Sequence, residues 1–119
     1  MISKTLYFKD RLLFIKKHLE LVNPFLPVTL TPKEIEVLAG FMSIDGEVGK
    51  IDRFGPSSRK IVRKRLALSH GGLGNYISAL KAKGFIRIGQ EEGLYIPEIL
   101  TPEKNEQEYS FRLRLENNG

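Results

Sequence analysis

The chain has 119 residues, which is enough for one domain with a real core and too few for two of ordinary size. Apolar residues make up 41% and charged residues 28%, so the composition is that of a globular protein and excludes a wholly disordered chain. The absence of cysteine excludes a disulfide scaffold and a cysteine-based zinc site, and it fits a reducing compartment. No long uncharged run follows Met1, so we expect neither a signal peptide nor a membrane span. The chain is therefore expected to be cytoplasmic.

The net charge of +5 is distributed unevenly along the chain. Residues 50–87 carry ten basic side chains and a single acid, Asp52, whereas residues 1–49 are balanced and residues 88–119 are acidic. A basic block between a neutral and an acidic part is typical of a protein that binds a polyanion. A solvated basic surface without a partner explains the composition equally well, so the choice depends on the pattern of elements.

The first part of the chain, residues 1–28, predicts an N-terminal arm followed by a helix. Residues 2–8 indicate a short strand or a loose arm, and apolar residues recur at helical spacing over 10–22. The helix has more apolar residues than one packing face needs, namely Leu12, Leu13, Phe14, Ile15, Leu19, Leu21 and Val22. The surplus predicts either a two-fold homodimer formed through residues 10–22 or a helix that caps the core of its own domain.

The domain that follows, residues 29–116, opens with a well-defined helix start. Thr31 is a favourable N-cap, Pro32 fits the first helical position, and Glu34 can reach back to the cap backbone. These three residues make a capping box, and an apolar face continues along the helix. A loop is predicted after it at 45–49.

Two further helices are predicted after this loop. The first spans about 58–68, and the second is capped by Ser69 and runs to about residue 83, where Gly84 ends it in a left-handed conformation. Three glycines crowd the start of the second helix, Gly71, Gly72 and Gly74. They predict a close approach of the backbone to a phosphate, a loose first turn, or a helix that starts only near Leu73.

The C-terminal third indicates two strands joined by a long acidic loop. An apolar strand is predicted at 85–88, and strict alternation of apolar and polar residues predicts a half-buried strand at 109–115. The loop 89–108 contains a candidate short strand at 94–96. Its acidic residues are Glu91, Glu92, Glu98, Glu103, Glu106 and Glu108. Since DNA would repel them, the acidic loop 91–108 is predicted to point away from it or to bind a protein partner.

The stretch 66–86 resembles the turn, recognition helix and first wing strand of winged helix-turn-helix proteins. The shared features are small or polar turn residues, a helix with Leu and Ile at helical spacing, a Leu-Lys-x-Lys-Gly ending at 80–84 and a following apolar strand. The similarity is strongest over 57–88 and is at the level of the superfamily, which includes small phage and plasmid regulators, replication initiators and multiple-antibiotic-resistance-type repressors. It implies an α+β fold, a three-helix winged helix-turn-helix with a β-hairpin wing, here with an extra N-terminal helix.

The resemblance and the residue chemistry together predict sequence-specific binding to double-stranded DNA, as in a transcriptional regulator of a bacterial or phage-infected cell. A recognition helix needs an apolar face that seats it and a small, polar face that enters the major groove. The predicted base contacts are His70, Asn75, Ser78 and Lys81. The predicted phosphate contacts are Arg59, Lys60, Arg63, Lys64, Lys83 and Arg87. Like charges four residues apart on the helix at 58–68 repel one another, and a polyanion would relieve them.

Catalysis and cofactors have little support in the sequence. The histidines are His18 and His70, and there is no evident nucleophile–base pair, metal cluster or nucleotide-binding fingerprint, so we expect no enzyme activity and no cofactor. His18 is predicted on an exposed helix face. The alternative to DNA binding is a protein-interaction winged helix in a phage replication, packaging or virion assembly, with the N-terminal helix and the acidic loop as its working surfaces. RNA or single-strand binding is less favoured because the basic block has no aromatic platform.

Overall fold

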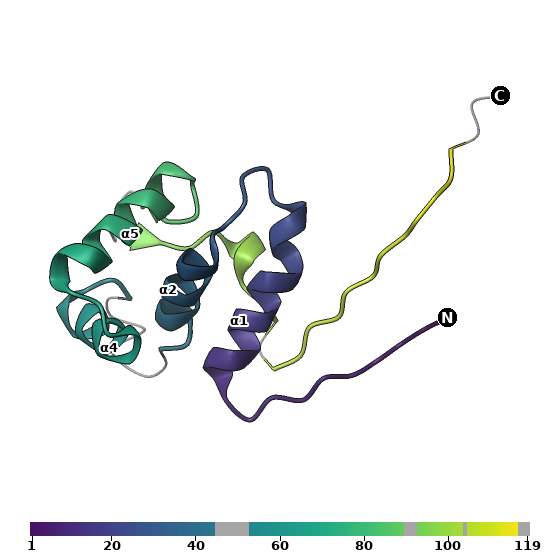
Figure 1. The fold of residues 1–119 in the computed structure, drawn as a ribbon, viewed down its shortest axis with the longest axis horizontal. Helices are drawn as coiled ribbons and strands as arrows, with labels where there is room; N and C mark the ends of the chain where they lie inside the picture. Colours follow the sequence, from purple (N-terminus) through teal and green to yellow (C-terminus); the bar gives the residue numbers. More distant parts are fainter. Residues whose placement is uncertain (45–52, 90–92, 104, 117–119) are drawn as a thin grey trace.

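The computed structural model describes residues 1–44, 53–89, 93–103 and 105–116. These residues form an α+β fold with four α-helices, a two-stranded antiparallel sheet and two short 3₁₀ helices (Figure 1). The α-helices are α1 (Arg11–Val22), α2 (Pro32–Met42), α4 (Pro56–Leu66) and α5 (His70–Ala82). The strands are β1 (Arg87–Ile88) and β2 (Leu94–Tyr95), and the 3₁₀ helices are η1 (Asn23–Phe25) and η2 (Glu98–Leu100). The loop predicted at 45–49 lies outside the described residues.

Helix α2 is the centre of the hydrophobic core. It lies between α1 on one side and α4 and α5 on the other (Figure 1), and its residues Val37, Leu38, Ala39 and Phe41 are fully buried. Helix α1 adds Ile15 and Leu19 to the same buried cluster. The N-terminal helix and the rest of the chain therefore share one core, and α1 is an integral part of the folded body.

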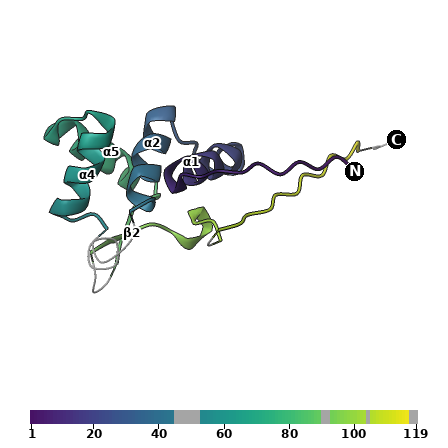
Figure 2. The same ribbon diagram turned by 90° about the horizontal axis from the view of Figure 1, so that it is seen from below.

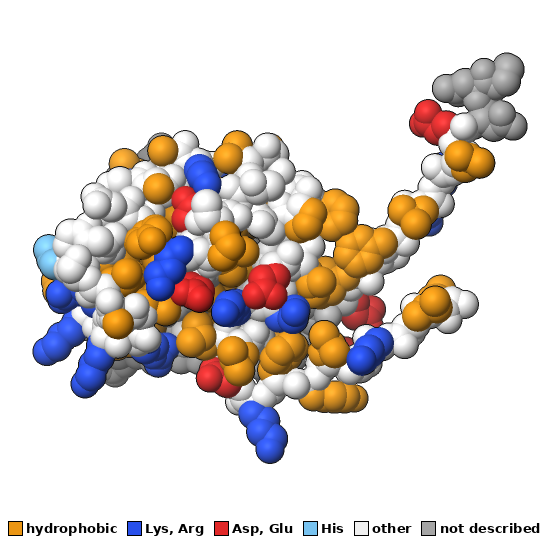
Figure 3. Space-filling view, in the orientation of Figure 1, with side chains coloured by type: hydrophobic (Ala, Val, Ile, Leu, Met, Phe, Trp, Pro, Cys, Tyr) orange, Lys and Arg blue, Asp and Glu red, His pale blue; other side chains and the backbone are white. Residues whose placement is uncertain are grey.

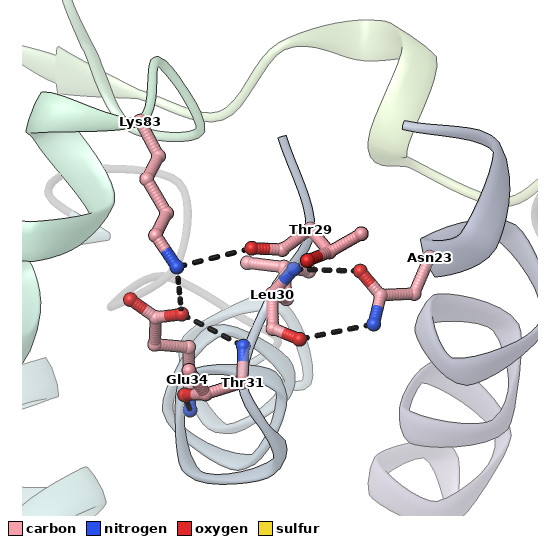
Figure 4. Close-up of polar contacts among 6 residues, drawn as sticks. All are labelled: Asn23, Thr29, Leu30, Thr31, Glu34 and Lys83. Carbon is pink, nitrogen blue, oxygen red and sulfur yellow. Dashed lines mark hydrogen bonds and ion pairs between the residues drawn. The ribbon is translucent and has the colours of Figure 1, made fainter. Parts of the chain in front are cut away.

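Hydrogen bonds from side chains fix the path from α1 into α2. The capping box predicted at α2 is confirmed, because Thr31 Oγ1 accepts from the Glu34 N–H (3.2 Å) and Glu34 Oε1 accepts from the Thr31 N–H (2.8 Å). Just before this cap, the Asn23 side chain bonds both backbone groups of Leu30, at 2.6 Å to the nitrogen and 3.0 Å to the oxygen (Figure 4). The connection is thus held at both of its ends.

Helices α4 and α5 are joined by a three-residue turn. The C-cap of α4 is Ala67, whose left-handed backbone (φ 52°) is the one positive φ found among the described non-glycine residues. Ser69 Oγ accepts a hydrogen bond from the Gly72 N–H (2.9 Å), which confirms the predicted cap. The helix therefore begins at His70, and the later start considered from the glycines is wrong. Gly84 follows α5 with φ +82°, the left-handed end that the sequence predicted.

The two strands form a short hairpin. Its antiparallel register pairs Arg87 with Tyr95 and Ile88 with Leu94. The candidate short strand at 94–96 is therefore the partner of β1. The strand predicted at 85–88 begins later than expected, because Phe85 and Ile86 are buried in the core before the chain reaches the hairpin.

The strand predicted at 109–115 is wrong. The described residues from 105 to 116 adopt no regular secondary structure, and Phe111, Leu113 and Leu115 are 60%, 99% and 96% exposed. A period of two selects an extended backbone, but a strand also needs a neighbouring strand to pair with. Because β1 pairs with the nearer segment β2, this stretch is left extended, without a partner strand among the described residues.

Both ends of the chain leave the body as extended arms on the same side of the molecule (Figures 1 and 2). Residues 1–10 form the N-terminal arm and are exposed. At the other end, the chain passes α1, where Leu100 is buried, and leaves the body beyond Phe111. No helix among the described residues is long and apolar enough to cross a membrane.

The chain ends also account for the apolar surplus of α1. The ring of Phe8 contacts that of Phe14, with centroids 6.3 Å apart. Leu21 and Val22 line a shallow groove together with the C-terminal segment 108–111. Much of the surplus is therefore covered within the chain, and the homodimer through residues 10–22 stays a prediction.

Candidate nucleic-acid interface

The outward face of α4 is basic. Lys60, Lys64 and Arg65 are exposed on it, whereas Val62 on the opposite face is buried. Residues 53–90 contain no aspartate or glutamate, so α4 itself carries no acid that could offset these charges. Lys and Arg side chains accordingly gather over α4 in the space-filling view (Figure 3). Such a surface attracts a polyanion.

The arginines of this helix are partly held by neutral groups. Arg59 Nε donates to the Phe54 carbonyl at 2.6 Å, and Arg65 Nη1 donates to Ser43 Oγ at 3.2 Å. Both acceptors are neutral, so these two bonds orient the guanidinium groups without neutralising their charge. Arg63 is half-buried, and its Nε finds no hydrogen-bond partner among the described residues. The two lysines, by contrast, are exposed to solvent.

Helix α5 presents a small, polar stripe to solvent. Three of the predicted base contacts, Asn75, Ser78 and Lys81, are exposed and recur every three residues, so they follow one side of the helix. The opposite side is buried through Leu73, Ile77 and Leu80. The fourth, His70, is exposed in the first turn of α5, just across the short turn from Lys64. The basic end of α4 therefore adjoins the start of the polar stripe.

Two glycines of α5 face open space. A Cβ at Gly71 or Gly74 would meet nothing within 4 Å, whereas one at Gly72 would lie 2.9 Å from Ser69 Oγ. Packing inside the protein therefore does not require glycine at Gly71 or Gly74, although glycine costs about 0.5–1 kcal/mol relative to alanine inside a helix. A partner that approaches the helix backbone closely is a physical reason for both.

Lys83 differs from the other predicted phosphate contacts, because its ammonium group is engaged inside the molecule (Figure 4). Its Nζ lies 2.6 Å from Glu34 Oε1 and 3.0 Å from the Thr29 carbonyl oxygen. Burial raises the pKa of Glu34, but the hydrogen bonds from Lys83 and Thr31 and the charge of Lys83 outweigh it and hold that pKa below its usual value. We therefore leave Lys83 out of the candidate interface.

The hairpin contributes a cation, and the described acids of the predicted loop lie beyond it in the chain. Arg87 is exposed in β1, and its Nε donates to the Gly84 carbonyl at 3.1 Å. The expectation of one long acidic wing loop is wrong for the described acids Glu98, Glu103, Glu106 and Glu108, which follow the hairpin. They lie on the segment that passes α1, away from α4 and α5 (Figures 1 and 2). Glu91 and Glu92 lie outside the described residues.

A buried polar cluster on α1 was not anticipated. His18 is 4% exposed, so its predicted position on an exposed helix face is wrong. Its Nε2 lies 3.0 Å from the Leu100 carbonyl oxygen, and its Nδ1 hydrogen-bonds the Tyr109 hydroxyl. Since a carbonyl can only accept, the neutral ring carries its proton on Nε2 and accepts from Tyr109 at Nδ1. Burial lowers the pKa of His18 and raises that of Tyr109.

Comparisons with protein-family models, with curated proteins and with solved structures found no match for this chain. The described helices and the antiparallel hairpin define an α+β protein and are compatible with a winged helix-turn-helix. Among the described residues, no three His, Asp or Glu side chains gather in a way that could hold a metal ion. The functional argument therefore depends on the surface of α4 and α5.

Proposed function

We propose that this protein is a winged helix-turn-helix that binds double-stranded DNA sequence-specifically and regulates transcription. The observation that carries the proposal is the joining, through one short turn, of an acid-free basic face on α4 to a small, polar face on α5. This is the division of labour that DNA recognition needs, since phosphate contacts position a protein and base contacts specify the sequence.

In the proposed complex, α5 enters the major groove with its polar stripe toward the base edges. The Asn75 amide can pair bidentately with adenine, and Ser78 and Lys81 can reach neighbouring bases. The open positions at Gly71 and Gly74 let the first turn of the helix come close to the backbone of one strand.

The remaining cations hold the protein on the DNA backbone. Lys60 and Lys64 are free to contact phosphates, with Arg59 and Arg63 beside them on the same helix. Arg87 lies in the wing and would contact the backbone next to the groove that α5 occupies. The acids beyond the hairpin lie on the far side of the molecule, where they do not oppose this approach.

Salt dependence of binding to duplex DNA tests the proposal. Each phosphate contact that is lost reduces the slope of log affinity against log salt by about 0.9. We expect Lys60→Ala with Lys64→Ala to weaken binding to every duplex by a similar factor and to reduce the slope by about one to two units. The matched control is Lys16→Ala with Lys17→Ala on α1, which removes the same charge from side chains that face Glu36 and Glu20.

An unchanged slope and affinity in the α4 variant would contradict the phosphate role. The basic face would then be a solvated surface. The favoured interpretation would then be a protein-interaction module that uses the exposed acidic residues Glu98, Glu103, Glu106 and Glu108.

A further inference from the structure

The C-terminal arm, residues 109–116, carries an apolar face that its own chain covers only at the start of the arm. Tyr109, Phe111, Leu113 and Leu115 alternate with polar residues, so they share one side of the extended backbone. Exposure rises along this side to 99% at Leu113 and 96% at Leu115. Contiguous exposed apolar side chains of this kind mark an interaction surface.

The first half of the arm shows which surface this face prefers. Tyr109 bonds His18 on α1, and the ring of Phe111 lies against Phe25 with centroids 5.3 Å apart. Beyond Phe111 the arm runs off the end of α1 and into solvent (Figure 1). The same apolar face therefore continues where its own helix no longer covers it.

We propose that the C-terminal arm, together with residues 105–108 that precede it, pairs with the same segment of a second copy, and that the resulting two-stranded antiparallel ribbon lies across both α1 helices. In this arrangement Leu113 and Leu115 of each copy extend over the α1 of the other copy. The backbone groups of the extended arm gain the neighbouring strand that the chain itself does not provide. The inference rests on the arm alone and is independent of the proposed DNA binding.

The charges along residues 106–114 favour a second copy of the chain as the partner, and they favour one register of pairing. If residue 110 faces its own counterpart on the two-fold axis, Glu108 lies opposite Arg112 and Glu106 lies opposite Arg114. The ribbon then has four cross-strand pairs of opposite charge on its polar side, and Tyr109 lies opposite Phe111 on its apolar side. A shift of two residues in either direction keeps only two of the four opposite-charge pairs. An unrelated partner would have to match this spacing by chance, whereas a second copy matches it by symmetry.

The mass of the full chain in solution tests the interface. We expect sedimentation up to about 100 µM, well above the Kd of standard specific interfaces, to give twice the 13.5 kDa of one chain. Leu113→Asp with Leu115→Asp should return the mass to that of one chain. The control is Ile99→Asp, which removes another exposed apolar side chain outside the arm and should leave the dimer intact.

The register is tested by charge exchange and by cross-linking. Glu108→Arg and Arg112→Glu should each weaken the dimer, and the double variant should restore it. Because the chain has no cysteine, Ser110→Cys places one thiol per copy at the proposed axis, where a short bis-maleimide should join two chains. In this register the two Glu116→Cys thiols would lie about 40 Å apart and should not be joined.

A species of one chain mass at every concentration would overturn the proposal, as would a dimer that survives both leucine changes. Cross-linking of Glu116→Cys as fast as Ser110→Cys would overturn the register. Binding of the leucine variant to a single half-site should be unchanged, so a failure of this inference is distinguishable from a failure of DNA binding.

Discussion

The Nζ of Lys83 lies 2.6 Å from the Oε1 of Glu34, a contact that ties the end of α5 to the start of α2 (Figure 4). Glu34 is 4% exposed and also completes the capping box with Thr31. A charge-assisted bond to a nearly buried carboxylate is stronger than an ordinary surface ion pair. One carboxylate thus both starts the central helix and anchors the helix proposed to read DNA.

Lys83→Met should therefore affect the stability of the fold and Lys81→Met the binding of DNA, although the two lysines are only two residues apart. Loss of Lys83 leaves the Glu34 carboxylate buried without its cation and should lower the free energy of unfolding by about 1–3 kcal/mol, with no change in the salt slope of DNA binding. Lys81→Met should leave stability unchanged and weaken DNA binding. Urea unfolding and DNA titrations measure the two effects, and a reduced salt slope in Lys83→Met would return that lysine to the interface.

The pH dependence of this contact follows from the lowered pKa of Glu34. A carboxyl group with a lowered folded-state pKa stabilises the protein above its unfolded value, here 4.5, and loses that contribution as the pH falls through the folded-state pKa. The stability difference between the wild type and Lys83→Met should therefore shrink below about pH 4.5. A difference that is constant with pH would show that the loss does not come from the ion pair.

Local signals in the sequence predicted most of the helical structure. The capping box at Thr31 and Glu34, the Ser69 cap and the left-handed Gly84 depend on residues a few positions apart, and all are present as expected. The exposed positions of Asn75 and Ser78 follow from the same helical period. These features could be predicted because the interactions that create them lie within one or two turns of helix.

Contacts between distant residues could not be predicted in this way. His18 and Tyr109 are 91 positions apart, and neither the helical pattern around the first nor the alternation around the second points to the other. Lys83 looked like a free cation because its partner Glu34 lies 49 positions earlier. The alternation at 109–115 correctly indicated an extended chain, but the presence of a pairing strand is a property of the whole fold.

His18 should make the protein less stable in mild acid. Its pKa is lowered from 6.5 by burial, although the hydrogen bond to Leu100 opposes the shift, so the unfolded chain binds more protons than the folded one between the two pKa values. Neutral His18 therefore contributes fully to the stability of the fold above about pH 7.5. That contribution is lost as the pH falls through 6.5 toward the pKa of His18 in the folded state. Between about pH 7.5 and about pH 5.5, the Tm of thermal unfolding should decrease less for His18→Gln than for the wild type. His70→Gln, at an exposed site, should behave as the wild type, and an equal decrease in all three proteins would remove His18 as the cause.

Gly71 and Gly74 should reveal a conflict between stability and binding. Because a Cβ at either position meets open space, Gly74→Ala should raise the free energy of unfolding by about 0.5–1 kcal/mol. On the proposed DNA-facing side, Gly71→Ala with Gly74→Ala should displace the helix backbone from a phosphate and cost about 1.5–3 kcal/mol of binding free energy, the worth of one charged hydrogen bond. Urea unfolding and titration with duplex DNA give both quantities on the same proteins. If the double variant is more stable and binds as well as the wild type, the backbone does not approach the DNA closely at this turn.

Asn75→Ala should change which sequences are bound without changing how strongly duplex DNA is bound in general. Asn75 is exposed in the middle of the polar stripe, so its removal should leave the fold and the phosphate contacts of α4 intact. A bidentate contact from asparagine to adenine is worth about 1–3 kcal/mol of discrimination at one base pair. Selection from a random duplex library should therefore yield, for the variant, a consensus that has lost its preference at that position and kept it elsewhere. The matched control is Lys64→Ala, which removes a proposed phosphate contact and should weaken binding while the consensus stays the same. An unaltered consensus for Asn75→Ala would show that α5 does not read bases through this residue, and uniform weakening on all sequences would place Asn75 among the backbone contacts.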